Sequence, residues 1–303
     1  MGRKIRRSYT TSGNYLRMRV LVTGATGFIG GYVISELIKR NIDVVASSTS
    51  IEKARQKEWF NKVTFIEHNL TSPHDNLVQY FSNPDVLIHL AWRGLPNYKE
   101  LFHIEEELMV QYSFLKQLIE EGLTNINITG TCFEYGMQEG CLNEETTIAD
   151  PANSYSLAKD TLRKFLFLLK DRYRFSIKWY RLFYMYGEGQ NEKSILSQLE
   201  QALESNDSSF NMSLGEQRRD YSKVEDMAKY LVDCSLQNET EGIINLSSNS
   251  PIKIKDLVNK YLTERNKSIY LNLGFYPYPD YEPFAFWGDN SKLKKIIHNY
   301  ESN

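Results

Sequence analysis

The stretch that most constrains the fold is Val20–Gly31, in which an apolar run leads directly into spaced glycines. The apolar run has the composition of a buried strand, and Tyr32–Lys39 has the period of a helix. Gly24 permits a sharp turn, Gly27 lets backbone approach a ligand, and Gly30 lets the helix pack on the strand. The helix N-terminus offers unpaired N–H groups and a positive dipole end to a diphosphate. The dinucleotide contacts expected here are Gly24, Thr26, Gly27, Phe28, Ile29 and Gly30.

Length and composition are those of an ordinary globular protein. The 303 residues suffice for one large α/β domain with a smaller lobe, and the net charge of −2 gives no reason to expect a nucleic-acid partner. Cys132, Cys141 and Cys234 have neither metal-ligand nor disulfide-framework spacing, so we expect no metal and a reducing, cytoplasmic compartment. No apolar run approaches the ~20 residues of a membrane span.

Residues 1–17 differ from the rest of the chain because they are basic and rich in polar, turn-forming residues. They lack the apolar segment of a signal peptide. We expect a disordered extension here rather than a nucleic-acid-binding arm, with the folded domain starting near Met18.

Strand-like segments alternate with amphipathic helical ones, which predicts an α/β fold with a doubly wound parallel sheet of the Rossmann type. The strand-like segments are Arg19–Thr23, Asp43–Ala46, Val63–Ile66, Asp85–Leu90, Asn125–Thr129, Ser176–Leu182 and Gly242–Leu246. The helical segments are Gly31–Lys39, His103–Glu120 and Ser156–Lys170.

From Glu188 onward the pattern is less regular, with loops expected around Ser205–Gln217 and Pro277–Phe286. We therefore expect a smaller C-terminal substrate-binding lobe over the carboxyl edge of the sheet. The expected boundaries are 18–187 with 222–260 for the dinucleotide-binding domain, and 188–221 with 261–303 for the lobe.

The end of the second strand bears on the choice of cofactor. In NAD-binding folds an acidic residue there accepts a hydrogen bond from the ribose 2′-OH. Here Ser47 and Ser48 occupy the strand end, and Lys53 and Arg55 follow. Hydroxyl groups and cations suit a 2′-phosphate. The sequence thus favours NADP(H), and NAD(H) remains possible.

The segment Asp85–Gly94 runs from a buried strand into small and then bulky residues. We expect the cofactor to pass close to Leu90 and Ala91. Trp92 and Arg93 either line the substrate entrance or belong to an ordinary loop. His89, inside the strand, is expected to be a hydrogen-bonded core histidine rather than a catalyst.

Tyr155 and Lys159 are four residues apart in a predicted helix, which places both on one face. A nearby cation stabilises a phenolate, so Lys159 is expected to lower the pKa of Tyr155 and make it a proton donor or acceptor near neutral pH. Thr131 closes the preceding strand, and its hydroxyl is placed to bind the carbonyl oxygen that Tyr155 protonates. These are the expected catalytic residues.

With these residues in view, the chain resembles the extended short-chain dehydrogenase/reductases, in the branch of nucleotide-sugar epimerases, dehydratases and reductases. The resemblance extends from about Met18 to Lys292. It rests on the glycine triplet, on Thr131–Gly136, on Tyr155 with Lys159, on Arg181–Gly187, and on Arg218–Tyr221 followed by Val224 and Asp226.

The resemblance implies further roles. Lys159 would also hold the nicotinamide ribose, Arg219 would meet the nucleotide diphosphate, and Phe183 and Tyr184 would flank the sugar. Cys132 and Phe133 would contact substrate after Thr131, and Asn69 with Leu70 would lie near the adenine. The helical segments His103–Glu120 and Ser156–Lys170 resemble a pair that forms a four-helix dimer contact, so a homodimer is expected.

Departures from the family pattern narrow the activity. The dehydratases place an Asp-Glu pair directly after the catalytic Thr, whereas this chain has Cys132 and Phe133 there and Glu134 one place later. The family's epimerases usually carry an acidic residue after the second strand, which is missing here. What remains resembles an NAD(P)H-dependent 4-ketoreductase of a nucleotide-activated 4-keto-6-deoxyhexose, in surface-polysaccharide biosynthesis. The alternatives are a 4-epimerase with tightly bound NAD and a dinucleotide-sensing protein without catalysis.

Overall fold

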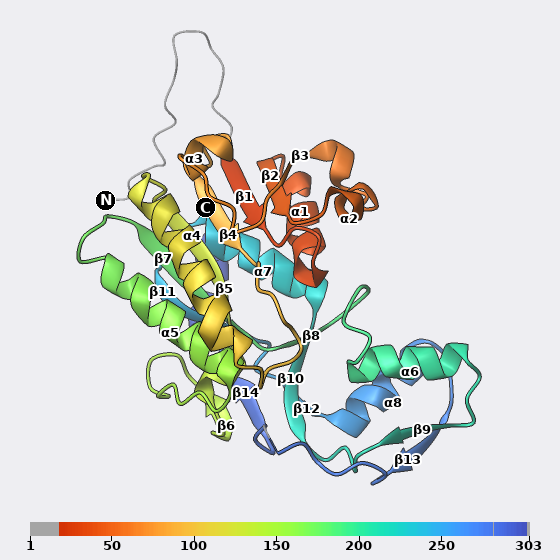
Figure 1. The fold of residues 1–303 in the computed structure, drawn as a ribbon. Coiled ribbons are helices and arrows are strands. Elements are labelled where there is room, and N and C mark those ends of the chain that lie inside the picture. The colour runs from red at the N-terminus through yellow and green to blue at the C-terminus, as the bar shows by residue number, and fades with distance from the viewer. Residues whose placement is uncertain (1–17, 281, 302–303) are drawn as a thin grey trace.

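The structure, a computed structural model, describes residues 18–280 and 282–301 (Figure 1). Its centre is a parallel sheet of seven strands in the order β11-β7-β5-β4-β1-β2-β3. In chain order these strands are β1 (Arg19–Thr23), β2 (Asp43–Ser48), β3 (Thr64–Glu67), β4 (Val86–His89), β5 (Asn125–Thr131), β7 (Ser176–Leu182) and β11 (Gly242–Leu246). Each strand-like segment predicted from the sequence lies in this sheet, which confirms the doubly wound α/β fold. The predicted extension, 1–17, lies outside the described residues.

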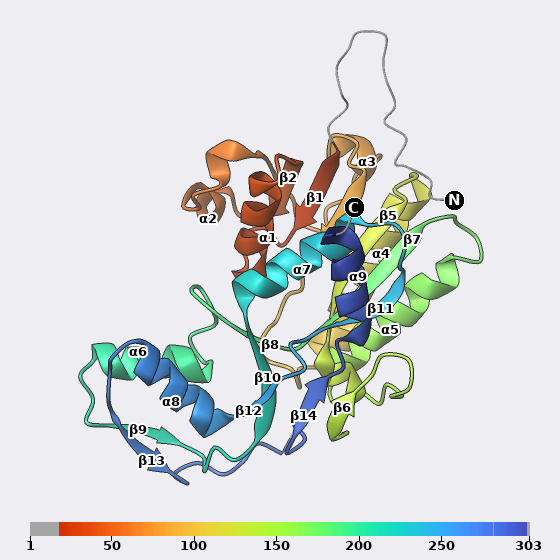
Figure 2. The same ribbon diagram turned by 180° about the vertical axis from the view of Figure 1, so that it is seen from behind.

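Helices cover both faces of the sheet, as Figures 1 and 2 show from opposite sides. One face carries α1 (Phe28–Lys39), α7 (Val224–Leu236) and α9 (Ser291–Glu301), and the other carries α3 (Leu77–Tyr80), α4 (Leu108–Glu120) and α5 (Ser154–Leu169). Successive strand residues point to opposite faces. Val20 and Val22 of β1 accordingly belong to the first core, and Leu21 belongs to the second. The central strands are buried on both sides, as their continuous apolar runs require.

Local capping explains where one of the predicted helices begins. Asn153 Oδ1 accepts a hydrogen bond from the backbone N–H of Ser156 at 2.9 Å, and the Asn153 N–H donates to Ser156 Oγ. This reciprocal cap starts α5 at Ser154, two residues before the predicted start. The predicted helix His103–Glu120 begins with a π-helical turn, His103–Glu107, and continues as α4.

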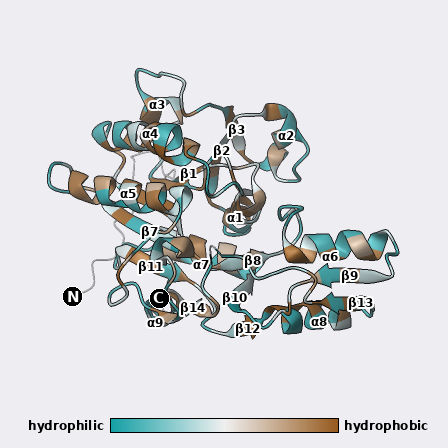
Figure 3. Cartoon of the chain, turned by 60° about the horizontal axis from the view of Figure 1, so that its bottom comes forward, coloured by the Kyte–Doolittle hydropathy of each residue, from teal (hydrophilic) through white to brown (hydrophobic). Residues whose placement is uncertain are grey.

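A smaller lobe lies beside the sheet and has its own apolar core (Figure 3). It contains α6 (Ile195–Glu204), β9 (Ser209–Met212), α8 (Ile254–Glu264) and β13 (Tyr270–Leu273). Two further small sheets are present: β8 (Tyr184–Tyr186), β10 (Arg218–Lys223) and β12 (Pro251–Lys253) form one, and β6 (Gly140–Leu142) and β14 (Phe286–Gly288) form the other. The short helix α2 (Ile51–Arg55) follows β2.

The two cores divide the chain differently from the expected boundaries. Leu257 and Val258 of α8 pack with Leu199 of α6, so α8 belongs to the lobe although 222–260 was assigned to the sheet domain. Leu293 and Ile296 of α9 pack on the sheet side, although 261–303 was assigned to the lobe. The physical reason is the apolar stripe of each helix, whose burial partner is set by three-dimensional position and not by chain order.

Two neighbouring glycines of α1 provide a matched test of the packing behind the first turn. A Cβ on Gly30 would lie 2.4 Å from the Gly24 carbonyl oxygen, whereas one on Gly31 would meet only the Trp59 Nε1 atom, at 3.7 Å. We expect Gly30→Ala to lower the free energy of unfolding by about 1–3 kcal/mol through overpacking. Gly31→Ala should be neutral or stabilising by up to about 1 kcal/mol, because alanine is the better helix former. Urea unfolding of both variants measures this, and equal losses would contradict it.

Candidate functional site

The candidate site lies at the carboxyl ends of the strands, where the strand order reverses between β1 and β4. Ligands of open α/β sheets bind in the crevice at this position. Gly24 has φ of +69°, and a Cβ there would lie 2.8 Å from the backbone nitrogen of Ala91. The turn after β1 and the segment after β4 therefore approach closely, which places Leu90 and Ala91, the expected neighbours of the cofactor, at the glycine turn.

The start of α1 has the properties of an anion-binding turn. Gly27 is the N-cap, no side chain caps the helix, and no acidic residue lies in the first turn. The N–H groups at Phe28 and Ile29 thus have no competing side chain, and Thr26 lies beside them in the turn. These residues fit the diphosphate of a dinucleotide.

The predicted catalytic residues meet at the end of β5. Thr131 is the last residue of β5 and caps the 3₁₀ turn Cys132–Tyr135. Tyr155 lies in the first turn of α5, and its phenol interacts with the side chain of Thr131. The backbone N–H of Tyr155 donates to the Tyr98 carbonyl at 3.0 Å, which ties α5 to the loop after β4. Lys159 follows one helical turn later.

The phenol of Tyr155 is buried, and burial raises its pKa above the usual value. Tyr98, Glu134 and Cys132 raise this pKa further, and the hydrogen bond with Thr131 opposes the rise. The predicted lowering of the Tyr155 pKa by Lys159 is therefore wrong for this structure. The phenol remains protonated near neutral pH, which is the state of a proton donor.

Lys159 is almost completely buried and its ammonium group has two partners. Nζ donates to the Thr129 carbonyl at 2.8 Å and lies 4.1 Å from the centroid of the Trp92 ring. Burial lowers the pKa of Lys159 from 10.5 to about 7, although Glu134 and Glu107 oppose this shift. These two contacts direct the ammonium group toward the backbone of β5 and toward Trp92.

Trp92 is held over the site by a histidine that the sequence analysis did not single out. Its indole Nε1 donates to His103 Nδ1 at 3.1 Å, and its ring contacts that of Tyr155 edge to face. Arg93 lies beside it, but its guanidinium and its backbone N–H both bind the buried carboxylate of Glu107. His103 and Glu107 belong to the π-helical turn, a feature for which the sequence carries no recognisable signal.

His89 is a core residue, as predicted. Its ring nitrogens bond Thr23 Oγ1 and Gln111 Oε1, and the ring is fully buried. Burial lowers the pKa of His89 to about 3, so the ring is neutral.

Glu134 has a structural partner set that explains its position in the sequence. Its carboxylate is buried and accepts hydrogen bonds from the Thr131 N–H at 2.9 Å, from Trp179 Nε1 at 2.9 Å, and from Arg181 Nε at 2.8 Å. The ion pair with Arg181 is almost fully removed from solvent. The carboxylate is thus directed away from the crevice and toward β7.

The predicted substrate contacts form an apolar wall next to Tyr155. The side chains that pack together there are Cys132, Phe133, Tyr155, Phe183 and Phe286, with Trp92, Tyr98 and Tyr184 against them. A cavity of about 660 Å³ opens beside this wall, lined among others by Tyr98, Phe133, Tyr184, Lys193, Tyr221 and Glu282. The structure therefore brings Phe133 and Tyr184 to one cavity and leaves Cys132 and Phe183 buried behind them.

Arg219 was predicted to meet a diphosphate, but its guanidinium is occupied in this structure. Nη2 donates to the Glu282 carboxylate at 2.8 Å, and Nη1 donates to the carbonyls of Arg218 and Phe284. The side chain is almost fully buried and lies against the Phe286 ring. A diphosphate must replace Glu282 to reach it.

The remaining predicted cofactor residues lie at the neighbouring strand ends. The Ser47 carbonyl accepts from the Ala25 N–H at 3.1 Å, and Ser48 is the last residue of β2. Asn69 follows β3 and bonds the Thr71 N–H, while Leu70 packs against the core of the α4–α5 face.

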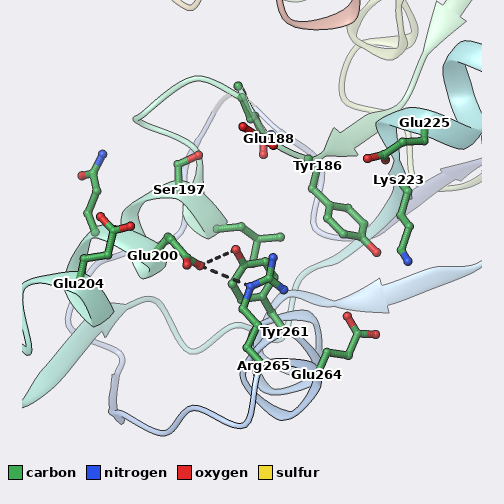
Figure 4. Close-up of a pocket in the computed structure, with 15 residues that line it drawn as sticks. Tyr186, Glu188, Ser197, Glu200, Glu204, Lys223, Glu225, Tyr261, Glu264 and Arg265 are labelled. Atoms are coloured by element: carbon green, nitrogen blue, oxygen red, sulfur yellow. Dashed lines mark hydrogen bonds and ion pairs between the residues drawn. The ribbon is translucent and has the colours of Figure 1, made fainter. Parts of the chain in front are cut away.

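A second cavity, of about 620 Å³, lies between α6, α8 and the start of α7 (Figure 4). Glu200 there accepts a hydrogen bond from the Tyr261 hydroxyl at 2.6 Å and pairs with Arg265 at 3.6 Å. None of Thr131, Tyr155 and Lys159 lines it. This cavity is thus separate from the candidate catalytic residues.

The glycine turn at the strand-order reversal and the Rossmann sheet together define a dinucleotide-binding α/β protein. A family model described as "NAD dependent epimerase/dehydratase family" matches residues 20–247. The chain belongs to this family, and it is accordingly an enzyme of the NAD-dependent epimerase/dehydratase class.

Two characterised relatives cover most of the chain. It is 27% identical over 272 residues to dTDP-6-deoxy-L-talose 4-dehydrogenase (NAD(+)) of Aggregatibacter actinomycetemcomitans, covering 89% of this chain and 99% of the relative. It is 29% identical over 267 residues to dTDP-4-dehydro-6-deoxyglucose reductase of Escherichia coli, covering 82% of each. Among solved structures, UDP-glucuronic acid 4-epimerase from Bacillus cereus, in complex with UDP-glucuronic acid and NAD, has a TM-score of 0.79 at 22% identity over 93% of each chain.

Two classes of feature are absent from the part of the chain that the structure describes. No helix within residues 18–280 and 282–301 is long and apolar enough to cross a membrane. The same residues contain no cluster of His, Cys, Asp or Glu that could hold a metal ion.

The buried ammonium of Lys159 makes stability depend on pH. Its pKa is 10.5 when exposed and about 7 in the fold, so the unfolded chain binds more protons between these values. The stabilising contribution is therefore present above pH 10.5 and is lost as the pH falls through 7. We expect the free energy of unfolding of the wild type, minus that of Lys159→Met, to rise with pH across this window. Urea unfolding at several pH values measures it, and a constant difference would contradict the burial of a titrating Lys159.

Proposed function

We propose that this enzyme is an NAD(P)H-dependent 4-ketoreductase of a nucleotide-activated 4-keto-6-deoxyhexose. The first substrate to test is dTDP-4-dehydro-6-deoxyglucose, with a dTDP-6-deoxyhexose such as dTDP-fucose as product. The observation that carries the proposal is the buried phenol of Tyr155 beside Thr131 and an apolar wall. The two relatives named for 4-oxidoreduction of dTDP-6-deoxy sugars support the same reaction class.

The proposed reaction adds a hydride to the C4 carbon of the sugar and a proton to its oxygen. The bound nicotinamide supplies the hydride. Tyr155 donates the proton to the carbonyl oxygen, and the Thr131 hydroxyl holds that oxygen by a hydrogen bond. The Lys159 ammonium binds the cofactor ribose, either in place of the Thr129 carbonyl or together with it. Trp92 and Arg93 border the substrate entrance. Reprotonation of Tyr155 from solvent completes the cycle.

The side chains around the crevice favour simple reduction of a deoxy sugar. Dehydration needs a free acid and base next to the sugar, yet Glu134 is bound by Thr131, Trp179 and Arg181. Phe133 presents carbon to the cavity, which suits a C6 methyl group better than a hydroxymethyl group, because a buried hydroxyl without a partner is costly. Arg219 binds the diphosphate after releasing Glu282.

The second candidate is a nucleotide-sugar 4-epimerase, because solved epimerases share the fold. An epimerase keeps NAD tightly bound and returns the hydride to the same sugar, so it consumes no reduced cofactor. The two functions therefore differ in a measurable quantity.

The deciding experiment follows absorbance of reduced nicotinamide while the protein is incubated with dTDP-4-dehydro-6-deoxyglucose and either NADPH or NADH. Oxidation that depends on the sugar nucleotide supports the reductase. If no reduced cofactor is oxidised, NAD is found in the purified protein and C4 epimers are interconverted, the proposed reductase is wrong and the epimerase takes its place.

Removing the Tyr155 hydroxyl tests the proposed proton donor. Tyr155→Phe should lower kcat by about 10²–10⁴-fold, the usual contribution of a general acid, because the phenyl ring cannot protonate the carbonyl. The dissociation constant of the dinucleotide, measured by calorimetry, should change little, and the melting temperature should confirm folding. Wild-type turnover in a folded Tyr155→Phe protein would contradict the assignment.

We further propose a cytoplasmic homodimer that supplies activated sugars for surface polysaccharides, including O-antigen and lipopolysaccharide. The support for the dimer is an exposed apolar strip on α4 and α5. Met109 is 50% exposed, Leu157 43%, Phe165 36% and Leu168 66%. The Phe165 ring also packs edge to face against Tyr112 across the two helices, with ring centroids 5.4 Å apart. Such a strip on two adjacent helices matches a self-complementary interface.

A charge in this strip should dissociate the dimer. Leu168→Glu places a carboxylate at the centre of the contact, and light scattering should then give the mass of a monomer. Ile148→Glu, at an 80% exposed loop position outside α4 and α5, is the matched control and should leave the mass unchanged. Monomeric wild-type protein would contradict the proposed interface.

A further inference from the structure

The carboxyl end of β2 is where this chain lacks the acidic residue that binds an adenine ribose. Ser48 ends the strand, and its hydroxyl reaches the Ser50 carbonyl only at 3.5 Å, the limit of a hydrogen bond. The hydroxyl therefore offers a ribose only a weak, uncharged partner. The sequence-based preference for NADP(H) rested on this position and on the cations that follow it.

The neighbouring strand places a carboxylate at the same level. Ser48 pairs with Glu67, the last residue of β3, in the parallel register of the two strands. Paired residues of parallel strands project to the same face of the sheet. Glu67 therefore projects on the face on which Ser48 projects, one strand further toward the edge of the sheet.

A hydrogen bond holds the Glu67 carboxylate against the turn that follows β2. Glu67 Oε1 accepts from the backbone N–H of Ile51 at 3.1 Å, although the residues are sixteen positions apart. Glu67 Oε2 receives no hydrogen bond from the residues that the structure describes, and the side chain is exposed. The Tyr80 hydroxyl donates to the Glu67 carbonyl at 3.1 Å and fixes the strand end from the other side. One carboxylate oxygen is thus positioned and the other remains open to a ligand.

The charges around the turn are of both signs. Glu52 Oε2 accepts from the Ser50 hydroxyl at 2.9 Å, so a second carboxylate flanks the turn opposite Glu67. Lys53 and Arg55 are exposed on α2 and form no ion pair with a described residue. A 2′-phosphate at this turn would meet two carboxylates, whereas a 2′-hydroxyl would find a charged acceptor.

We propose that Glu67, supplied by β3 in place of an acidic residue on β2, binds the adenine-ribose hydroxyl and selects NAD(H) over NADP(H). This reverses the preference drawn from the sequence. This proposal rests on the proposed function only in that the enzyme must bind a nicotinamide dinucleotide. It does not depend on which sugar is reduced.

The test is binding of NADH and NADPH to the full chain without sugar substrate, measured by calorimetry. The wild type should bind NADH at least about tenfold more tightly than NADPH. Glu67→Gln keeps an oxygen for the Ile51 N–H and removes the charge, so the fold should be retained. It should weaken NADH binding by about tenfold, the value of one hydrogen bond to a charged group, and should not weaken NADPH binding.

Two further variants distinguish contact from general charge. Glu52→Gln removes a carboxylate from the same turn and should change the NADH-to-NADPH ratio by much less than Glu67→Gln. Ser48→Asp in the Glu67→Gln background restores a carboxylate on β2 and should recover the preference for NADH. Equal effects of Glu52→Gln and Glu67→Gln, or a wild type that prefers NADPH, would overturn the proposal. If the wild type shows the ratio but no keto-sugar is reduced, only the proposed function fails.

Discussion

The buried carboxylate of Glu134 holds the reacting edge of this molecule in place. It accepts from the Thr131 N–H, from Trp179 and from Arg181, so it joins the end of β5 to β7 and fixes the turn that follows Thr131. A buried carboxylate of this kind is tolerated only with a full set of donors. Because all its oxygens serve this purpose, the same residue that positions the Thr131 hydroxyl is removed from the chemistry. Glu134 therefore has a structural role and does not act as an acid or base on the substrate.

Most of the sheet could be read from the sequence, because continuous apolar runs such as Arg19–Thr23 and Ser176–Leu182 are set by local composition. The grouping of Thr131, Tyr155 and Lys159 was also readable. Spacing on one helix predicts the tyrosine and the lysine, and the position at the end of the preceding strand predicts the threonine. The glycine turn could be predicted because each glycine meets a separate steric requirement, as the short Cβ distances at Gly24 and Gly30 show.

What the sequence could not predict depends on contacts between distant segments. The burial that raises the Tyr155 pKa, the Trp92–His103 hydrogen bond and the Arg219–Glu282 pair each join residues whose proximity no local pattern encodes. The lobe boundaries failed for the same reason, since an amphipathic helix such as α8 carries no mark of the core that it joins. The cofactor prediction considered the end of β2 by itself, whereas the pairing of β2 with β3 places Glu67 next to Ser48.

The helix α8 packs in the lobe, and α9, which follows it in the chain, packs on the sheet. This order has a consequence for how the two cores are completed. Leu293 and Ile296 complete the core that Val20 and Val33 begin, so the first strand and one of the last helices share a single apolar interior. This interior is complete only once α9 has been synthesised, and the segments of the lobe are interleaved along the chain with those of the sheet. The chain order therefore couples the completion of the sheet's core to a segment that follows the whole lobe.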